Sequence, residues 1–138
     1  MNSSDVIETT WGVDYWSLLL AIRLRESERV PILAQPYRSG PQYHGDMIFV
    51  SASFDKSKNG IWESGLVTDE LCQRRPDLAK NISKHLTYAR KGDKIPHPST
   101  GVNTFVAYLN LFSRESRGHV LELAAEVRRE LDNMIEWS

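Results

Sequence analysis

The stretch "DMIFVSASFDKSKNGIWESGLV", residues 46–67, contains the pattern that decides the fold class. Its first part, "DMIFVSASF", and its last part, "IWESGLV", are rich in residues that favour strands. The segment "DKSKNG" between them includes an Asn-Gly pair, which favours a reversal of the chain. The stretch therefore predicts an antiparallel β-hairpin. The segment "PILAQPY", residues 31–37, could add a third strand at an edge, where its prolines are tolerated.

The segments on either side of this hairpin predict helices. "VDYWSLLLAIRLRESE", residues 13–28, follows Thr9 and Thr10, either of which can act as an N-cap. Its centre is apolar almost all round, so we expect a central helix that is covered on more than one side. A short helix over 68–75 is expected to end ahead of Pro76.

The stretch "RRPDLAKNISKHLTYARKGDK", residues 74–94, holds seven Lys and Arg residues against two carboxylates. Proline suits a first helical turn, so a helix over 76–91 is expected. Its inner face would hold Leu78, Ile82, Leu86 and Ala89, and its outer face Lys80, Lys84 and Lys91. Such a stripe is either the solvated face of a surface helix, which is the commoner case, or a surface that binds an anion.

Two further segments complete the expected fold. "VNTFVAYLNLF", residues 102–112, fits both a strand and a helix, and we expect a helix because its apolar residues follow helical spacing. Residues 120–136 have one apolar and one charged face, which predicts a C-terminal amphipathic helix. The fold class expected is α+β, with four to five helices packed on a small antiparallel hairpin or three-stranded sheet, as one compact domain over 1–138.

Composition indicates a soluble globular protein, because 41% of its 138 residues are apolar and 25% are charged. The longest apolar run, residues 15–22, is too short to cross a bilayer, and the polar N-terminus lacks the pattern of a secretory signal. Cys72 is the single cysteine, so an intrachain disulfide is impossible. We therefore expect a cytoplasmic protein without a membrane partner.

The sequence names no reaction. Its four histidines lack metal-ligand spacing, and the glycine loops that bind nucleotide phosphates do not occur, so neither a metal nor a cofactor is predicted. Cys72 follows Leu71 in an expected short helix, which is typical of a small buried thiol rather than a nucleophile.

"RESRGH", residues 114–119, is similar to the Arg-x4-6-His signature of HEPN ribonucleases, which are small helical proteins that cleave RNA in a dimeric cleft. The resemblance would give His119 the proton transfer and Arg114 the stabilisation of the phosphorane. The same spacing occurs at 38–44 and at 90–97, so the motif discriminates weakly.

The irregular stretch "VPILAQPYRSGPQYHG", residues 30–45, offers the side chains typical of protein interfaces. We therefore predict a protein-binding module without catalytic activity, similar in kind to small inhibitor or immunity proteins. Its contact residues would be Tyr37, Arg38, Tyr43 and His44. The alternatives are a nucleic-acid-binding protein that uses the basic helix 76–91, and a metal-independent ribonuclease that uses Arg114 and His119.

Overall fold

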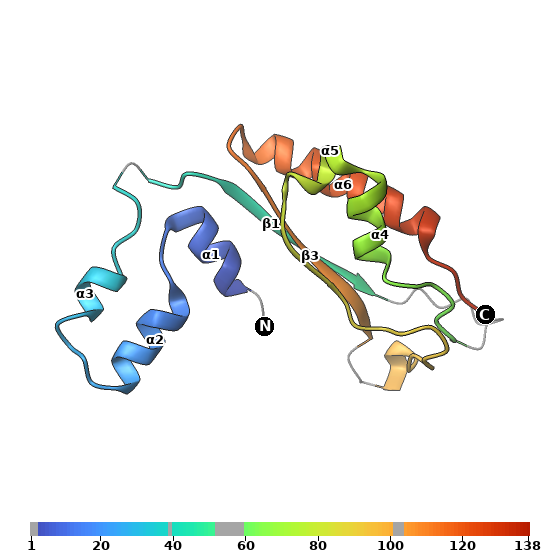
Figure 1. Ribbon diagram of the computed structural model, residues 1–138, viewed down its shortest axis with the longest axis horizontal. Coiled ribbons are helices and arrows are strands. Elements are labelled where there is room, and N and C mark those ends of the chain that lie inside the picture. Colours follow the sequence, from blue (N-terminus) through green and yellow to red (C-terminus); the bar gives the residue numbers. More distant parts are fainter. Residues whose placement is uncertain (1–2, 39, 52–59, 101–103) are drawn as a thin grey trace.

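The computed structural model describes residues 3–38, 40–51, 60–100 and 104–138. These residues contain one antiparallel sheet of three strands, β1 (His44–Ser51), β2 (Ile82–Thr87) and β3 (Phe105–Ser113), in the order β1-β3-β2. The last strand in the sequence therefore lies in the middle of the sheet (Figure 1). The prediction of an α+β fold is confirmed, with six α-helices in the described part of the chain.

The central strand β3 corrects the helix predicted over 102–112. Seven of its nine residues are buried, and Phe105 and Phe112 are the two more accessible ones. A strand that is covered on both faces loses the alternation of apolar and polar residues. Its apolar residues therefore matched helical spacing equally well, although Phe, Val and Tyr favour strands. Residues 102 and 103 lie outside the described part.

Two helices predicted from their patterns are confirmed, α4 (Val67–Arg74) and α6 (Arg117–Met134). They cover the same face of the sheet, with α6 against β1 and β3 and α4 against β2 and β3 (Figure 1). The buried face of α6 consists of Val120, Leu123, Ala124, Val127 and Leu131. Together with Leu71 of α4 and Ile48 and Leu109 of the sheet, these side chains form much of the core.

The helix predicted over 76–91 is wrong. Helix α5 (Pro76–Ala79) is a single turn, and the chain then continues as β2 along β3. Residues 82–87 thus form an edge strand, in which lysines are common because they discourage further pairing. Lys80, Lys84 and Lys91 consequently do not share one face of a helix. A 3-10 helix, η1 (Pro98–Thr100), follows in the loop toward β3.

The hairpin over 46–67 is half correct. Its first strand corresponds to β1, but the partner of β1 is β3 rather than residues 61–67. Residues 61 and 62 instead make isolated bridges, Ile61 with Lys94 and Trp62 with Trp137. The ring of Trp62 is fully buried and meets the Trp137 ring edge-on at 4.9 Å. The expected turn over 55–60 lies, apart from Gly60, outside the described residues.

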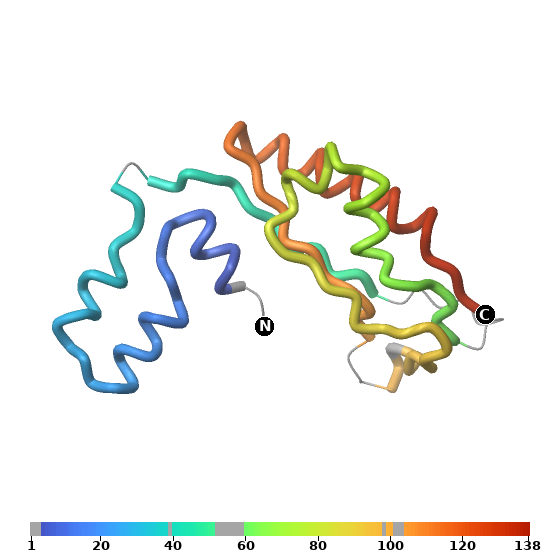
Figure 2. The backbone as a smooth tube through the Cα atoms, in the orientation of Figure 1, coloured from blue at the N-terminus to red at the C-terminus, as the bar shows by residue number. Residues whose placement is uncertain are grey.

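The N-terminal residues form three helices instead of one, α1 (Ser3–Trp11), α2 (Tyr15–Arg23) and α3 (Val30–Leu33). Gly12, with a φ of 76°, ends α1, and Asp14 begins α2 by accepting hydrogen bonds from the amides of Trp16 and Ser17. The third strand expected over 31–37 is therefore absent from these described residues, where α3 occurs instead. The two figures show α2 and α3 standing away from the sheet (Figures 1 and 2).

None of the helices in the described ranges combines the length and the apolar character that a membrane crossing requires.

Candidate functional site

The N-terminal helices carry an unusual number of exposed apolar side chains. We call residues 3–38 the helical arm. Its described residues include ten large apolar side chains that are each at least 38% exposed: Ile7, Trp11, Tyr15, Trp16, Leu19, Leu20, Ile22, Leu24, Ile32 and Tyr37. Within α2, all of which is described, Ala21 alone is buried. The prediction of a central, covered helix is therefore wrong. Large clustered apolar surfaces of this kind mark interaction sites.

The base of the arm is held by the segment that returns to the sheet. The backbone N–H of Tyr37 donates to the Trp11 carbonyl at 2.8 Å, and that of Gln42 donates to the Thr10 carbonyl at 3.1 Å. The Tyr37 ring lies against Gly12 so closely that a Cβ atom there would stand 2.5 Å from Tyr37 Cε1. Glycine at position 12 thus serves both the turn and the ring contact.

Helix α1 is the part of the arm that packs on the sheet. It packs over Gly45 of β1, where the missing side chain leaves room for Val6 and Thr10. Asp5 of α1 forms an ion pair of 2.8 Å with Lys84 of β2, and this hydrogen bond raises the pKa of the Lys84 ammonium group. The lysine expected to bind an anion is thus engaged by a carboxylate of the same chain.

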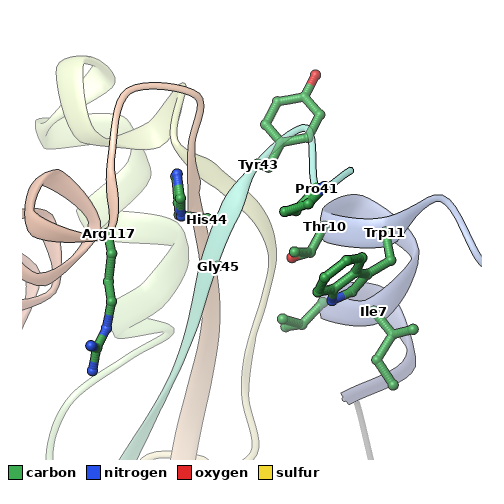
Figure 3. Close-up of a pocket in the computed structure, with 9 residues that line it drawn as sticks. Ile7, Thr10, Trp11, Pro41, Tyr43, His44, Gly45 and Arg117 are labelled. Atoms are coloured by element: carbon green, nitrogen blue, oxygen red, sulfur yellow. The ribbon is translucent and has the colours of Figure 1, made fainter. Parts of the chain in front are cut away.

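A cavity of about 350 Å³ lies between the arm and the sheet. Its walls consist of Val6, Ile7, Thr10, Trp11, Pro41, Tyr43, His44, Gly45 and Arg117. Figure 3 shows Ile7, Thr10 and Trp11 on one side of β1 and His44 and Arg117 on the other. The Thr10 hydroxyl is buried and has no hydrogen-bond partner among the described residues. Apart from the Thr10 hydroxyl the arm side of the cavity is apolar, whereas His44 and Arg117 make it polar beyond β1.

Tyr43 is held in place at the rim of this cavity. Its ring meets Phe112 edge-on with centroids 5.5 Å apart, and the Arg114 guanidinium carbon lies 4.9 Å from the Tyr43 centroid. Arg114 also donates a hydrogen bond to the Tyr43 hydroxyl. A fixed tyrosine loses little conformational entropy when it binds a partner, which suits an interface anchor.

The four residues predicted to bind a protein lie around the same base of the arm. Tyr43 and His44 line the cavity, while Tyr37 lies against Gly12 and Arg38 is exposed next to it. The sequence reasoning missed Ile7, Thr10, Trp11 and Arg117. Thr10 is an N-cap candidate in the sequence, whereas Ile7 and Trp11 precede the apolar run of residues 15–22 and carry no local signal of their own.

The residues of the ribonuclease hypothesis make separate contacts in the structure. Arg114 contacts Tyr43, whereas His119 Nδ1 lies 2.8 Å from the Ser113 hydroxyl and 3.4 Å from Glu115. Both His119 contacts use Nδ1, so they hold the ring in place, and neither of them brings it to Arg114. The three-stranded sheet also differs from the helical HEPN fold.

Cys72 does not have the features of a catalytic nucleophile. Burial raises the pKa of its thiol, and the charge of Asp69 raises it further. A thiol whose pKa is raised stays protonated at neutral pH.

Comparison with known proteins gives one partial relative. The chain is 45% identical over 131 residues to the ATP-grasp enzyme fsqD of Aspergillus fumigatus. The match covers 95% of this chain but 23% of that enzyme, so the chain spans about a quarter of the length of its relative. No protein-family model and no solved structure matches the chain.

Proposed function

We propose that this chain is a protein-binding module whose helical arm docks on another polypeptide. The proposal rests on the ten exposed large apolar side chains in the described part of the arm. Each large apolar side chain that becomes fully buried contributes about 1.5–3 kcal/mol, so a partner that covers several of them gains substantial binding free energy. Trp11, Trp16 and Tyr37 are of the types that dominate interface energetics.

The partner that we propose is a polypeptide of the kind that forms the rest of an ATP-grasp enzyme. In fsqD the matching segment is part of a chain about four times as long, so it is physically joined to the remaining 77% of that enzyme. An arm that projects from its own sheet is a suitable element for contact with such a neighbour. The cavity beside Tyr43 and His44 would then receive a side chain of the partner.

The arm fits a protein partner better than a small ligand. Its exposed apolar residues extend from Ile7 on α1 through Leu20 on α2 to Ile32 on α3, which is a broad surface rather than one pocket. Arg23, Arg25 and Glu28, all exposed, lie among or beside these residues. An apolar centre with charged residues around it is the usual anatomy of a protein interface.

A binding experiment in two pieces tests the proposal. The part of fsqD that lacks the matched segment is purified, and its affinity for this chain is measured by isothermal titration calorimetry. We expect Trp16→Ser and Leu20→Ser each to weaken binding by at least tenfold. Leu66→Ser is the matched control, because Leu66 is 53% exposed but lies outside the arm. Equal affinities for the arm variants and the control would contradict the proposal.

A further inference from the structure

The outer edge of β1 is a second feature that the arm does not account for. In the described residues β1 pairs with β3 alone, so every second residue of β1 directs its backbone N–H and C=O groups away from the sheet, and the carboxylate of Asp46 accepts from the N–H of Met47 at 2.9 Å. Natural proteins usually protect such an edge with charges, prolines or a covering segment. Here "MIFV", residues 47–50, gives this strand an apolar centre with high strand propensity.

Helix α6 runs beside this edge and presents one continuous exposed stripe. The stripe consists of Arg117, Leu121, Ala125, Arg128 and Asp132, all exposed, and at 100° per residue they fall within an arc of about 80°. Glu126 and Glu130 lie on the opposite flank of α6, where they bind Arg75 beside α4 and α5. Since α4 covers β2, the stripe lies on the β1 side.

Two hollows along the edge confirm where this stripe lies. Arg117 lines the cavity between the arm and the sheet, together with Tyr43, His44 and Gly45 at the start of β1. Arg128 and Asp132 line a second hollow, of about 260 Å³, together with residues 48–51 at the C-terminal end of β1. The two hollows therefore lie at the two ends of β1, on the side of α6. β1 with eight residues and α6 with eighteen are both about 26 Å long, so the edge and the stripe have matching lengths.

We propose that the edge of β1 binds an extended, acidic segment of a partner protein as a fourth strand of the sheet. Main-chain hydrogen bonds to β1 would supply the affinity, and the side chains facing α6 would supply the specificity. Arg117 and Arg128 favour an acidic segment, because these two positive charges, against the single carboxylate of Asp132 in the stripe, make no ion pair within the described part of the chain. Leu121, 52% exposed between them, favours an apolar residue there.

The spacing of the stripe defines the expected pattern. Arg117 and Arg128 are about 16 Å apart along α6, and alternate residues of a strand that are four apart span about 13 Å. The flexible arginine side chains cover the difference. The partner segment therefore carries two acidic residues at positions i and i+4, with an apolar residue at i+2, all on the face toward α6.

A peptide titration with the full chain tests this surface. The probe is a blocked nine-residue peptide of alternating threonine and valine, with glutamate at its third and seventh positions and leucine at its fifth. Binding is measured by fluorescence polarisation at low salt, and hydrogen exchange of the β1 amides is followed by NMR. We expect saturable binding that protects the outward-facing β1 amides, and about tenfold weaker binding to the Arg117→Glu/Arg128→Glu variant.

Matched controls make each outcome decisive. Arg129→Glu changes the charge equally on the outer face of α6 and should leave the affinity within twofold, and a peptide with lysines in place of both glutamates should not bind. Absent binding at 1 mM peptide, binding that ignores both arginines, or protection outside β1 would overturn the proposal. So would self-association of the chain that protects the same amides, because the occupant would then be a second copy. Because the variants Arg117→Glu/Arg128→Glu leave Trp16 and Leu20 unchanged, the peptide titration can fail while the fsqD experiment succeeds, and the reverse.

Discussion

Gly45 of β1 lies directly against Val6 of α1, so that a Cβ atom at position 45 would stand 3.0 Å from Val6 Cγ1. The same atom would stand 3.2 Å from the Thr10 hydroxyl oxygen. Both distances are shorter than ordinary van der Waals contact. The missing side chain therefore sets how closely the helical arm approaches the sheet.

Replacing Gly45 by valine should displace α1 from the sheet. Overpacking of this kind typically costs about 1–3 kcal/mol, so we expect a fall of that size in the free energy of unfolding, measured in urea. Gly118→Ala is the control, because a Cβ atom there meets Ser116 Oγ at 3.6 Å in a helical turn. That variant should be more stable by about 0.5–1 kcal/mol. Similar effects of the two substitutions would contradict this account of Gly45.

Trp62 should be a large contributor to stability. It is fully buried in the core, although its sequence neighbours suggested an ordinary strand. Trp62→Ala leaves a cavity, and we expect a loss of about 3–5 kcal/mol in the free energy of unfolding. Trp16→Ala, at a tryptophan that is 59% exposed, should cost about 1 kcal/mol or less. Thermal denaturation followed by circular dichroism distinguishes the two, and equal losses would refute the assignment.

Asp77 should make stability depend on pH in the acid range. The hydrogen bonds from Arg75 hold the pKa of the Asp77 carboxyl below its usual value of 3.8. A folded-state pKa below the unfolded one stabilises the protein above the unfolded value, and this contribution disappears as pH falls through the folded value. Asp77→Asn should therefore lower the melting temperature at pH 7.

The difference between wild type and Asp77→Asn should then shrink as the pH is lowered from about 5 to below 3.8. Asp132→Asn removes a carboxylate that makes no ion pair with any described residue, and its melting temperature should follow wild type throughout. A constant gap for Asp77→Asn across this range would rule out the electrostatic origin.

Ser116 should stabilise α6 as its N-cap. Its hydroxyl oxygen accepts a hydrogen bond from the backbone N–H of His119 at 3.0 Å. Removal of such a cap typically costs about 1 kcal/mol, so Ser116→Ala should lower the free energy of unfolding by that amount, whereas Ser116→Asp should preserve it. Urea titrations of the two variants provide the measurement, and a loss in Ser116→Asp equal to that in Ser116→Ala would argue against capping.

The elements that could be predicted from sequence are those whose signals are local. α4 ends ahead of Pro76, and α6 combines a cap with one apolar face, so a window of residues contains the evidence for each. β3 could not be predicted in this way, because burial on both faces removed the alternation of apolar and polar residues. β2 could not be predicted either, because its pairing with β3 is non-local. Pro76 and Asp77 are true helix signals, but the helix that they begin lasts one turn.

The candidate site was predicted in part for a related reason. Tyr43 and His44 stand out as polar aromatic residues in a proline-rich stretch, which is a local signal. Trp11 and Leu20 look like core residues, because composition does not distinguish an apolar side chain that packs within its own chain from one left for a partner. That distinction depends on tertiary structure, which places α2 and α3 of the arm away from the sheet.

The order β1-β3-β2 has a consequence for synthesis on the ribosome. β1 is complete at Ser51 and β2 at Thr87, but the described pairings of both require β3, which ends at Ser113. At a synthesis rate of about 5–20 residues per second, the ribosome completes the apolar strand β1 several seconds before it completes β3. Pairing between segments so distant in sequence is also intrinsically slow. The nascent chain therefore passes through an interval in which an unpaired strand is open to chaperones and to aggregation.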